Sequence, residues 1–339
     1  MPLTFSPVIV TTLLLAASGV AHASSFDCTS ATNPTEKAIC ADAYTSNLDQ
    51  KLGELWSATL PKVVDPKALK TDQRQWLKQR NQCSDNLSCL RQKYQMRITE
   101  LGHMTTPFSW DATWQMIAWG VSTGGELKTK RKDSTHITFD VLGASGANMG
   151  NLDGIATLNG TTAHYSEGNC ALTFIAMNGV LDVNQEGSDA DCGAGMGVFY
   201  AGRYVASEQS LAAENDLLSV GLVRTRQEDD VLHNLLKDDY QRLVESSSSR
   251  TIGDASSDVP DAEVDEMWVR GLGGINASIF MHTADSRFWL VLIVSDSRGN
   301  LRARYYTNVP SWKGRLPETL KRWYDKRAAA GSLPLDLMP

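Results

Sequence analysis

The sequence predicts a multidomain protein: a disulfide-stapled three-helix module (all-α), then a small antiparallel β domain, then an α+β C-terminal region. Three observations support this fold class. Four early cysteines lie among segments whose apolar residues recur at helical spacing. Short alternating runs with two Asn-Gly turns follow them. The last third of the chain mixes both patterns. We therefore expect domains at residues 24–104, 105–209 and 210–339, although the last two could instead pack as one unit.

Residues 1–23 are expected to be a signal peptide. An apolar stretch from Val8 to Leu15 precedes Ala21-His22-Ala23, a small–x–small cleavage pattern. The stretch is shorter than the roughly 20 residues that a membrane-spanning helix needs, and no later segment is long enough. We therefore expect a periplasmic or secreted protein with no membrane span after cleavage. In that compartment six cysteines favour three disulfides over a metal site, because none has C-x-x-C spacing.

The net charge of −7 is unevenly distributed. The helical segment holds 11 Lys or Arg and 9 Asp or Glu, whereas the β segment holds 5 and 11. Nucleic-acid binding depends on neutralising phosphates, so the acidic middle of the chain argues against it. The same charge would attract a basic protein partner.

The helical segment contains recognisable helix starts. Asn33-Pro34-Thr35-Glu36 combines a capping Asn, Pro at the first helical position and Glu three residues after the cap. This first helix is expected to run to Leu60-Pro61. Asp65-Pro66 opens a second helix, and Ser84 or Asp85 opens a third.

The helix order also suggests how the early cysteines pair. Short connections make neighbouring helices antiparallel, which would return Cys83 to the level of Cys40. We therefore expect a Cys40–Cys83 bridge, which leaves Cys28 to pair with Cys89. Four cysteines allow three connectivities, so this is one of three alternatives.

Residues of the helical segment also form a family pattern. The pattern consists of Phe26-Asp27-Cys28, Glu36-x-x-Ile39-Cys40, Leu48-Asp49, Gln73-Arg74-x-Trp76-Leu77-x-x-Arg80-x-x-Cys83, Cys89-Leu90 and Tyr94-x-x-Arg97-Ile98-x-x-Leu101. It resembles the LprI-type lysozyme inhibitor N-terminal domain family over about residues 26–101. The resemblance implies a small exported helical module held by disulfides. Some members of that family inhibit lysozyme.

The β segment is expected to form a sandwich or an open barrel. Alternating runs flank Asn159-Gly160 and Asn178-Gly179, both signals of a β-hairpin turn. Cys170 and Cys192 bracket the second hairpin, and we expect them to form the third disulfide.

The α+β region carries four signals. Glu228 to Glu245 has the spacing of a helix, and Phe288 to Val294 is an apolar run suited to a central strand. The serine run Ser246–Ser249, with residues 253–258, has the composition of a mobile loop. Leu316-Pro317-Glu318 opens a last helix.

One acidic loop is a candidate contact for a partner. Residues 182–191 place oxygen-bearing side chains at calcium-loop positions, but the twelfth place is Gly193 and the bidentate carboxylate is missing. We instead expect Glu186, Asp189 and Asp191 to face a basic protein surface, or to be solvated. No metal or other cofactor is expected.

Aromatic residues are expected to be structural. Trp76 and Arg80 lie one helical turn apart and should stabilise the helical core. Trp110, Trp114 and Trp119 could stack on sugars, but core packing is the favoured interpretation.

Several catalytic motifs are missing: the sequence lacks S-x-x-K, H-E-x-x-H and a phosphate-binding loop. We therefore expect a non-enzymatic periplasmic protein that binds and inhibits lysozyme or another peptidoglycan-degrading enzyme. Alternatives are an immunity protein that neutralises a wall-degrading toxin, a cell-envelope hydrolase, or a binding protein of another kind.

Overall fold

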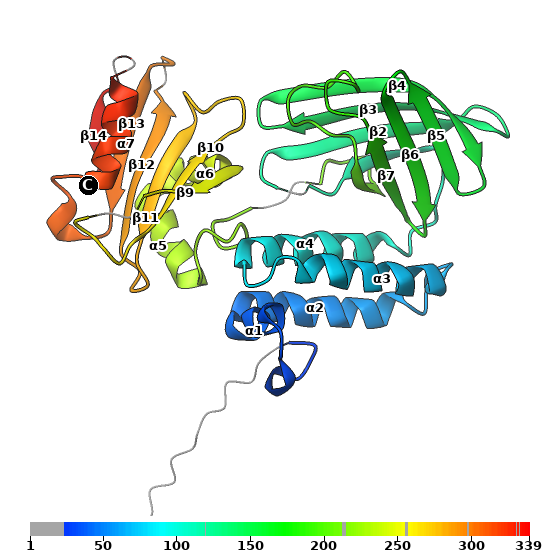
Figure 1. The fold of residues 1–339 in the computed structure, drawn as a ribbon, viewed down its shortest axis with the longest axis horizontal. Helices are drawn as coiled ribbons and strands as arrows, with labels where there is room; N and C mark the ends of the chain where they lie inside the picture. The colour runs from blue at the N-terminus through cyan, green and yellow to red at the C-terminus, as the bar shows by residue number, and fades with distance from the viewer. Residues whose placement is uncertain are drawn as a thin grey trace, which may run out of the picture.

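A computed structural model describes residues 24–118, 120–211, 215–254, 257–296, 298–329, 331 and 333–339. The described residues form a helical region, a β-barrel and an α+β region in chain order, as the fold class predicted (Figure 1). The helical region lies at the bottom of the view, with the α+β region at the upper left and the barrel at the upper right. The expected signal peptide at residues 1–23 lies outside the described residues. None of the helices in the described ranges is both long and apolar enough to cross a membrane.

The helical region contains one helix more than expected. Its helices are α1 (Pro34–Ala41), α2 (Ala43–Thr59), α3 (Pro66–Asn81) and α4 (Leu87–His103). The expected first helix is divided at Asp42. The Asp42 carboxylate caps α2 by accepting a hydrogen bond from the Thr45 amide at 2.8 Å, and it also pairs with Arg91. Asn33 and Asp65 cap α1 and α3 as predicted, whereas α4 is capped by Asn86 rather than by Ser84 or Asp85.

The expected pairing of the early cysteines is wrong. Cys28 bonds Cys40, and Cys83 bonds Cys89, so each bridge closes a short local segment. The Cα atoms are 5.8 Å apart in the first pair and 5.5 Å apart in the second.

The helices do return antiparallel, but this does not decide the pairing. The Thr35 hydroxyl donates to the Asn81 carbonyl at 3.3 Å, so α1 does lie beside the end of α3. However, the break at Asp42 leaves α1 as a short separate helix, packed against the 3-10 turn that carries Cys28. Local contacts of this kind cannot be read from the number of residues between cysteines.

The β region forms a closed barrel, not a sandwich or an open barrel. Its strands are β1 (Ala112–Met116), β2 (Thr123–Arg131), β3 (His136–Ser145), β4 (Asn148–Asn159), β5 (Thr162–Glu167), β6 (Cys170–Met177), β7 (Val180–Glu186) and β8 (Gly202–Ala206). Each strand pairs antiparallel with the next, and β1 also pairs with β8, which closes the barrel. Closure leaves no free edge to be covered.

Alternating side chains fill the barrel interior. Trp110 and Trp114 lie in this core, as predicted, and the Trp114 indole donates to the Thr129 hydroxyl at 2.8 Å. Trp119 lies outside the described residues. Both predicted hairpin turns are present, with positive φ at Gly160 and at Asn178. The predicted Cys170–Cys192 disulfide is confirmed.

The C-terminal region is a mixed sheet covered on both faces. Its strands are β9 (Ser249–Ile252), β10 (Glu263–Trp268), β11 (Ala277–His282), β12 (Phe288–Ser295), β13 (Leu301–Thr307) and β14 (Leu335–Leu337). The order is β14-β13-β12-β11-β10-β9, which places the predicted strand Phe288–Val294 inside the sheet. Even-numbered positions of β12 pack with α5 (Arg226–Leu236) and α6 (Tyr240–Ser246), and odd-numbered ones with α7 (Glu318–Ala328).

Two local expectations in this region are wrong. The helix expected from Glu228 to Glu245 is divided at Lys237, whose φ is +51°. The serine run is not a mobile loop, because it ends α6 and begins β9. Buried hydrogen bonds hold it: the Ser246 hydroxyl donates to the Leu243 carbonyl and contacts the Ser278 hydroxyl. Residues 255–256 lie outside the described residues.

Helix α4 joins the helical region to the rest of the chain. The fully buried Arg91 donates to the carbonyl oxygens of Leu218 and Val223 at 2.5 and 2.9 Å, and its charge is balanced by Asp42. On the barrel side, Val180 and Val205 are buried in the core of the helices. The helical region is therefore held against both neighbours and has fixed outer surfaces.

Candidate partner-binding surfaces

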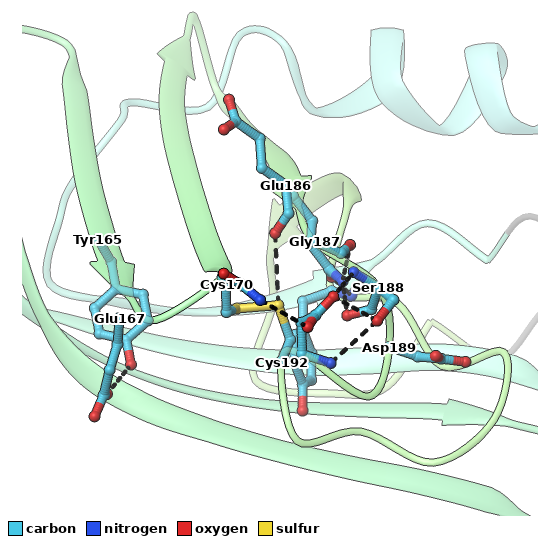
Figure 2. Close-up of a disulfide and its surroundings, with 12 residues drawn as sticks. Tyr165, Glu167, Cys170, Glu186, Gly187, Ser188, Asp189 and Cys192 are labelled. Carbon is cyan, nitrogen blue, oxygen red and sulfur yellow. Dashed lines mark hydrogen bonds between the residues drawn. A yellow bond between two sulfur atoms is a disulfide. The ribbon is translucent and has the colours of Figure 1, made fainter.

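The predicted acidic loop is held by a disulfide at the end of the barrel. Figure 2 shows the Cys170–Cys192 bridge, which ties the loop after β7 to the start of β6. Both cysteines are buried, and the Cys192 amide donates to the Ser188 carbonyl at 3.2 Å. The bridge therefore fixes the backbone on which the acidic residues are presented.

Two of the three predicted contact residues hold the loop in shape. The Asp191 carboxylate accepts hydrogen bonds from the Ser188 hydroxyl at 2.6 Å and amide at 2.8 Å. The Asp189 carboxylate accepts from the Gly197 amide at 2.5 Å and the Ala190 amide at 2.8 Å. These hydrogen bonds lower the pKa of both aspartates, which stay ionised at neutral pH.

Glu186 is the free carboxylate of the three. Its side chain is exposed and points away from the disulfide (Figure 2). Within the described part of the chain, its carboxylate makes no hydrogen bond or ion pair. Contact with a partner through Glu186, Asp189 and Asp191 remains a prediction, and Glu186 is the residue best placed to make it.

Exposed apolar side chains that the sequence analysis missed lie further along this loop and on the hairpin that it contacts. Met196 is 79% exposed, Met149 on the facing hairpin is 67% exposed and Phe199 is 43% exposed. The Gly195 amide donates to the Met149 carbonyl at 2.9 Å, so the loop and the hairpin meet here. Methionine is typical of binding surfaces because it is flexible and apolar. No spacing in the sequence distinguishes these residues from buried ones.

The outer face of α3 is a second exposed surface. It carries a basic stripe, defined as Lys67, Lys70, Arg74 and Lys78. At about 100° per residue, these positions fall within an arc of about 80° on the side opposite Trp76. Trp76 and Arg80 face inward and are structural, as predicted: Trp76 packs edge-on against Tyr94, and Arg80 donates to the Tyr94 hydroxyl at 3.0 Å.

The inward side of α3 is held against the barrel by a buried charge cluster. Arg203 of β8 contacts Asp72 at 2.5 Å and Glu100 at 2.8 Å, and Arg97 contacts the same two carboxylates at 2.6 Å each. Burial alone would raise the pKa of Asp72, but Arg203 and Arg97 outweigh it and lower that pKa. Burial raises the pKa of the neighbouring Asp182, whose carboxylate lies 3.6 Å from Arg203.

One cavity of the described region lacks ionisable side chains. A cavity of about 400 Å³ lies where α4, the loop after β1 and the segment before α5 meet. The described residues that line it include no Asp, Glu, His, Lys or Arg. No group of three or more His, Cys, Asp or Glu residues in the described ranges is placed to hold a metal ion.

Comparison with known proteins identifies one part of the chain. Residues 28–101 match the family described as Lysozyme inhibitor LprI, which confirms the predicted resemblance. The match ends within α4, so the barrel and the α+β region lie outside it. No curated protein and no solved structure matches the chain. The N-terminal helical region is therefore similar to this family and is called the LprI domain below; the family fits a general inhibitor role.

Proposed function

We propose that this protein is an exported, non-enzymatic protein that binds and inhibits a lysozyme-like glycoside hydrolase acting on the bacterial cell wall. The observation that carries the proposal is the LprI match at residues 28–101. The disulfides support the exported setting, because such bonds persist in oxidising compartments such as the periplasm.

Inhibition would occur by occlusion of the enzyme's cleft. A stable interface of standard size buries about 1,600 Å² in total, and a rigid surface loses little conformational entropy on binding. The LprI domain meets the second condition, because its helices are cross-linked and are held against the barrel and the α+β region.

The disulfide-anchored loop of the barrel is a candidate additional contact. Glu186 would face basic groups of the partner, and Asp189 and Asp191 would add negative potential while holding the loop. Together, the exposed apolar Met196 and these acidic residues resemble the arrangement of many interfaces, in which polar residues surround an apolar centre.

A turbidity assay tests the function directly. Purified residues 24–339 would be mixed with lysozymes of several types, and clearing of a cell-wall suspension would be followed over time. We expect inhibition that saturates at a fixed ratio of protein to enzyme, with a matching heat of binding in calorimetry. No inhibition at micromolar excess and no binding heat would contradict the proposal.

Two further measurements sharpen the test. Glu186→Lys should weaken inhibition if the loop contacts the enzyme, whereas Glu208→Lys, the same charge change at another exposed residue just after β8, should not. Incubation of the protein alone with labelled peptidoglycan should release no label. Release that a single substitution abolishes would instead identify a hydrolase.

A further inference from the structure

The basic stripe on α3 gathers four cations without an acidic partner on one exposed helix face. The inward-facing arginines are all paired: Arg80 with Asp49, Arg91 with Asp42 and Arg97 with Asp72. By contrast, none of the four stripe residues has a carboxylate oxygen within 4.0 Å among the described residues. Four cations that repel one another are therefore left facing solvent along about 16 Å of helix.

The rest of the domain's outer surface does not share this charge pattern. Helices α1 and α2 present both signs, with Glu36 beside Lys37 and Lys51 beside Glu54. The single carboxylate of α3 within its bounds, Asp72, points to the barrel and is neutralised there. Within the region that matches the inhibitor family, α3 is therefore the outer face with one uniform sign.

We propose that the basic stripe of α3 docks onto the carboxylate-bearing cleft of the inhibited glycoside hydrolase, with Lys70 and Arg74 facing its paired acids. This inference rests on the proposed function and adds the contact surface. Glycoside hydrolases typically hold two carboxyl groups about 5 to 9.5 Å apart in the cleft. Side chains at positions i and i+4 of a helix leave it about 5–6 Å apart, so Lys70 and Arg74 match that separation.

The chemistry of the two residues fits this role. The Arg74 guanidinium can bind one carboxylate through two parallel hydrogen bonds, and Lys70 can place a compact charge on the other. Arg74 is held by a local hydrogen bond to the Thr71 hydroxyl at 3.1 Å, which a partner carboxylate could replace without cost to the fold.

The position of α3 is fixed before any partner arrives. Trp76 packs on Tyr94, Asp72 pairs with Arg203, and the Asp65 amide at its start donates to the Asn178 side chain at 2.9 Å. Preorganisation of this kind lowers the entropy lost on binding, so less of the favourable interaction between complementary charges is offset and the affinity is higher.

The test compares two double variants of the full exported chain, residues 24–339. Lys70→Glu with Arg74→Glu reverses the stripe, and Lys37→Glu with Lys51→Glu makes the same charge change on α1 and α2. We expect the α3 variant to weaken inhibition at least about tenfold and to reduce its salt dependence. The control should inhibit like the wild type. Matching circular dichroism and melting would show that both variants fold.

The outcomes separate this inference from the proposed function. If the wild type inhibits and the α3 variant inhibits equally well, the docking surface is wrong while the function stands. If the wild type inhibits nothing, the function itself fails and takes this inference with it.

Binding to vesicles of phosphatidylglycerol, compared with phosphatidylcholine, provides a second readout. Loss of anionic-vesicle binding in the α3 variant, with inhibition intact, would assign the stripe to an anionic lipid surface and overturn the inference. An Arg74→Lys variant that is weaker than the wild type would support bidentate carboxylate binding.

Discussion

Arg203 of strand β8 and Asp72 of helix α3 form an ion pair across the junction between the barrel and the LprI domain, with their closest atoms 2.5 Å apart. Glu100 and Arg97 of α3's neighbour α4 complete the cluster. Because these charges are largely buried, each depends on the others to offset its desolvation. The cluster therefore couples the orientation of α3 to the barrel.

Replacement of Arg203 by Leu should destabilise the protein by about 3 kcal/mol, because Asp72 and Glu100 would keep their burial and lose one of their two cations. Urea unfolding followed by tryptophan fluorescence would measure the loss. Arg131→Leu removes an exposed arginine of the same barrel and should change stability little. Equal effects of the two variants would show that the cluster does not hold the junction.

The two aspartates of this junction should respond to pH with opposite signs. The pKa of Asp72 is lowered in the folded state, so its contribution to stability is present above its ordinary pKa of 3.8 and is lost as pH falls through the folded value. The pKa of Asp182 is raised, so ionised Asp182 costs stability at neutral pH. Asp72→Asn should therefore lower, and Asp182→Asn should raise, the melting temperature at pH 7.

Melting curves from pH 3 to 7 would check these signs. Asp72→Asn should also flatten the acid limb of the stability profile relative to the wild type, because one of the groups responsible for it is gone. A melting temperature at pH 7 above that of the wild type for Asp72→Asn, or below it for Asp182→Asn, would contradict the corresponding assignment.

Reduction should weaken the LprI domain more than the barrel. In the chain-entropy description, bridges with sequence separations of 12 and 6 contribute about 3 and about 2 kcal/mol, against about 3 for the single barrel bridge with a separation of 22. Hydrogen exchange before and after reduction would compare the two regions. If reduction increased the exchange rate more in the barrel than in α1–α4, the expected order would be wrong.

Peptide mapping of the oxidised protein should recover Cys28 with Cys40 and Cys83 with Cys89.

Gly179 should tolerate no side chain, because it is buried in a hairpin turn that packs against the chain at the end of α4. A Cβ atom there would lie 2.1 Å from the His103 carbonyl oxygen and 2.6 Å from that of Thr106, both backbone atoms at the end of α4. Gly179→Ala should therefore force the barrel and α4 apart and cost about 2 kcal/mol or more. Gly124→Ala, whose Cβ would meet nothing within 4 Å, is the matched control. Thermal unfolding of both variants gives the comparison, and equal melting temperatures would show that the turn can move away freely.

Much of the local structure could be predicted from the sequence. Asn33 and Asp65 begin helices because their side chains accept amide hydrogen bonds that the first helical turn leaves unmade. Asn159-Gly160 makes a hairpin because glycine adopts positive φ without strain. The run from Phe288 to Val294 is apolar on both faces because helices cover both.

The candidate surfaces were only partly predictable. The acidic loop was found because its composition is local, but the roles of Asp189 and Asp191 depend on how the backbone folds back to Gly197 and Ser188. The exposure of Met196 has no sequence signal at all. The basic stripe of α3 follows the helical period of the sequence. Whether its cations have ion-pair partners could be decided only from the positions of all neighbouring carboxylates.

By itself the sequence determined the element types and the turns, because these depend on neighbours within one or two helical turns or a single hairpin. It also determined the family resemblance of about residues 26–101, which rests on the order and spacing of residues along the chain. Only the tertiary structure decided the Cys28–Cys40 and Cys83–Cys89 bridges, the closure of the barrel through β1 and β8, and the Arg203–Asp72 junction. These depend on distances in space between segments whose relative positions are set by packing of the whole chain, and no local pattern of residues records them.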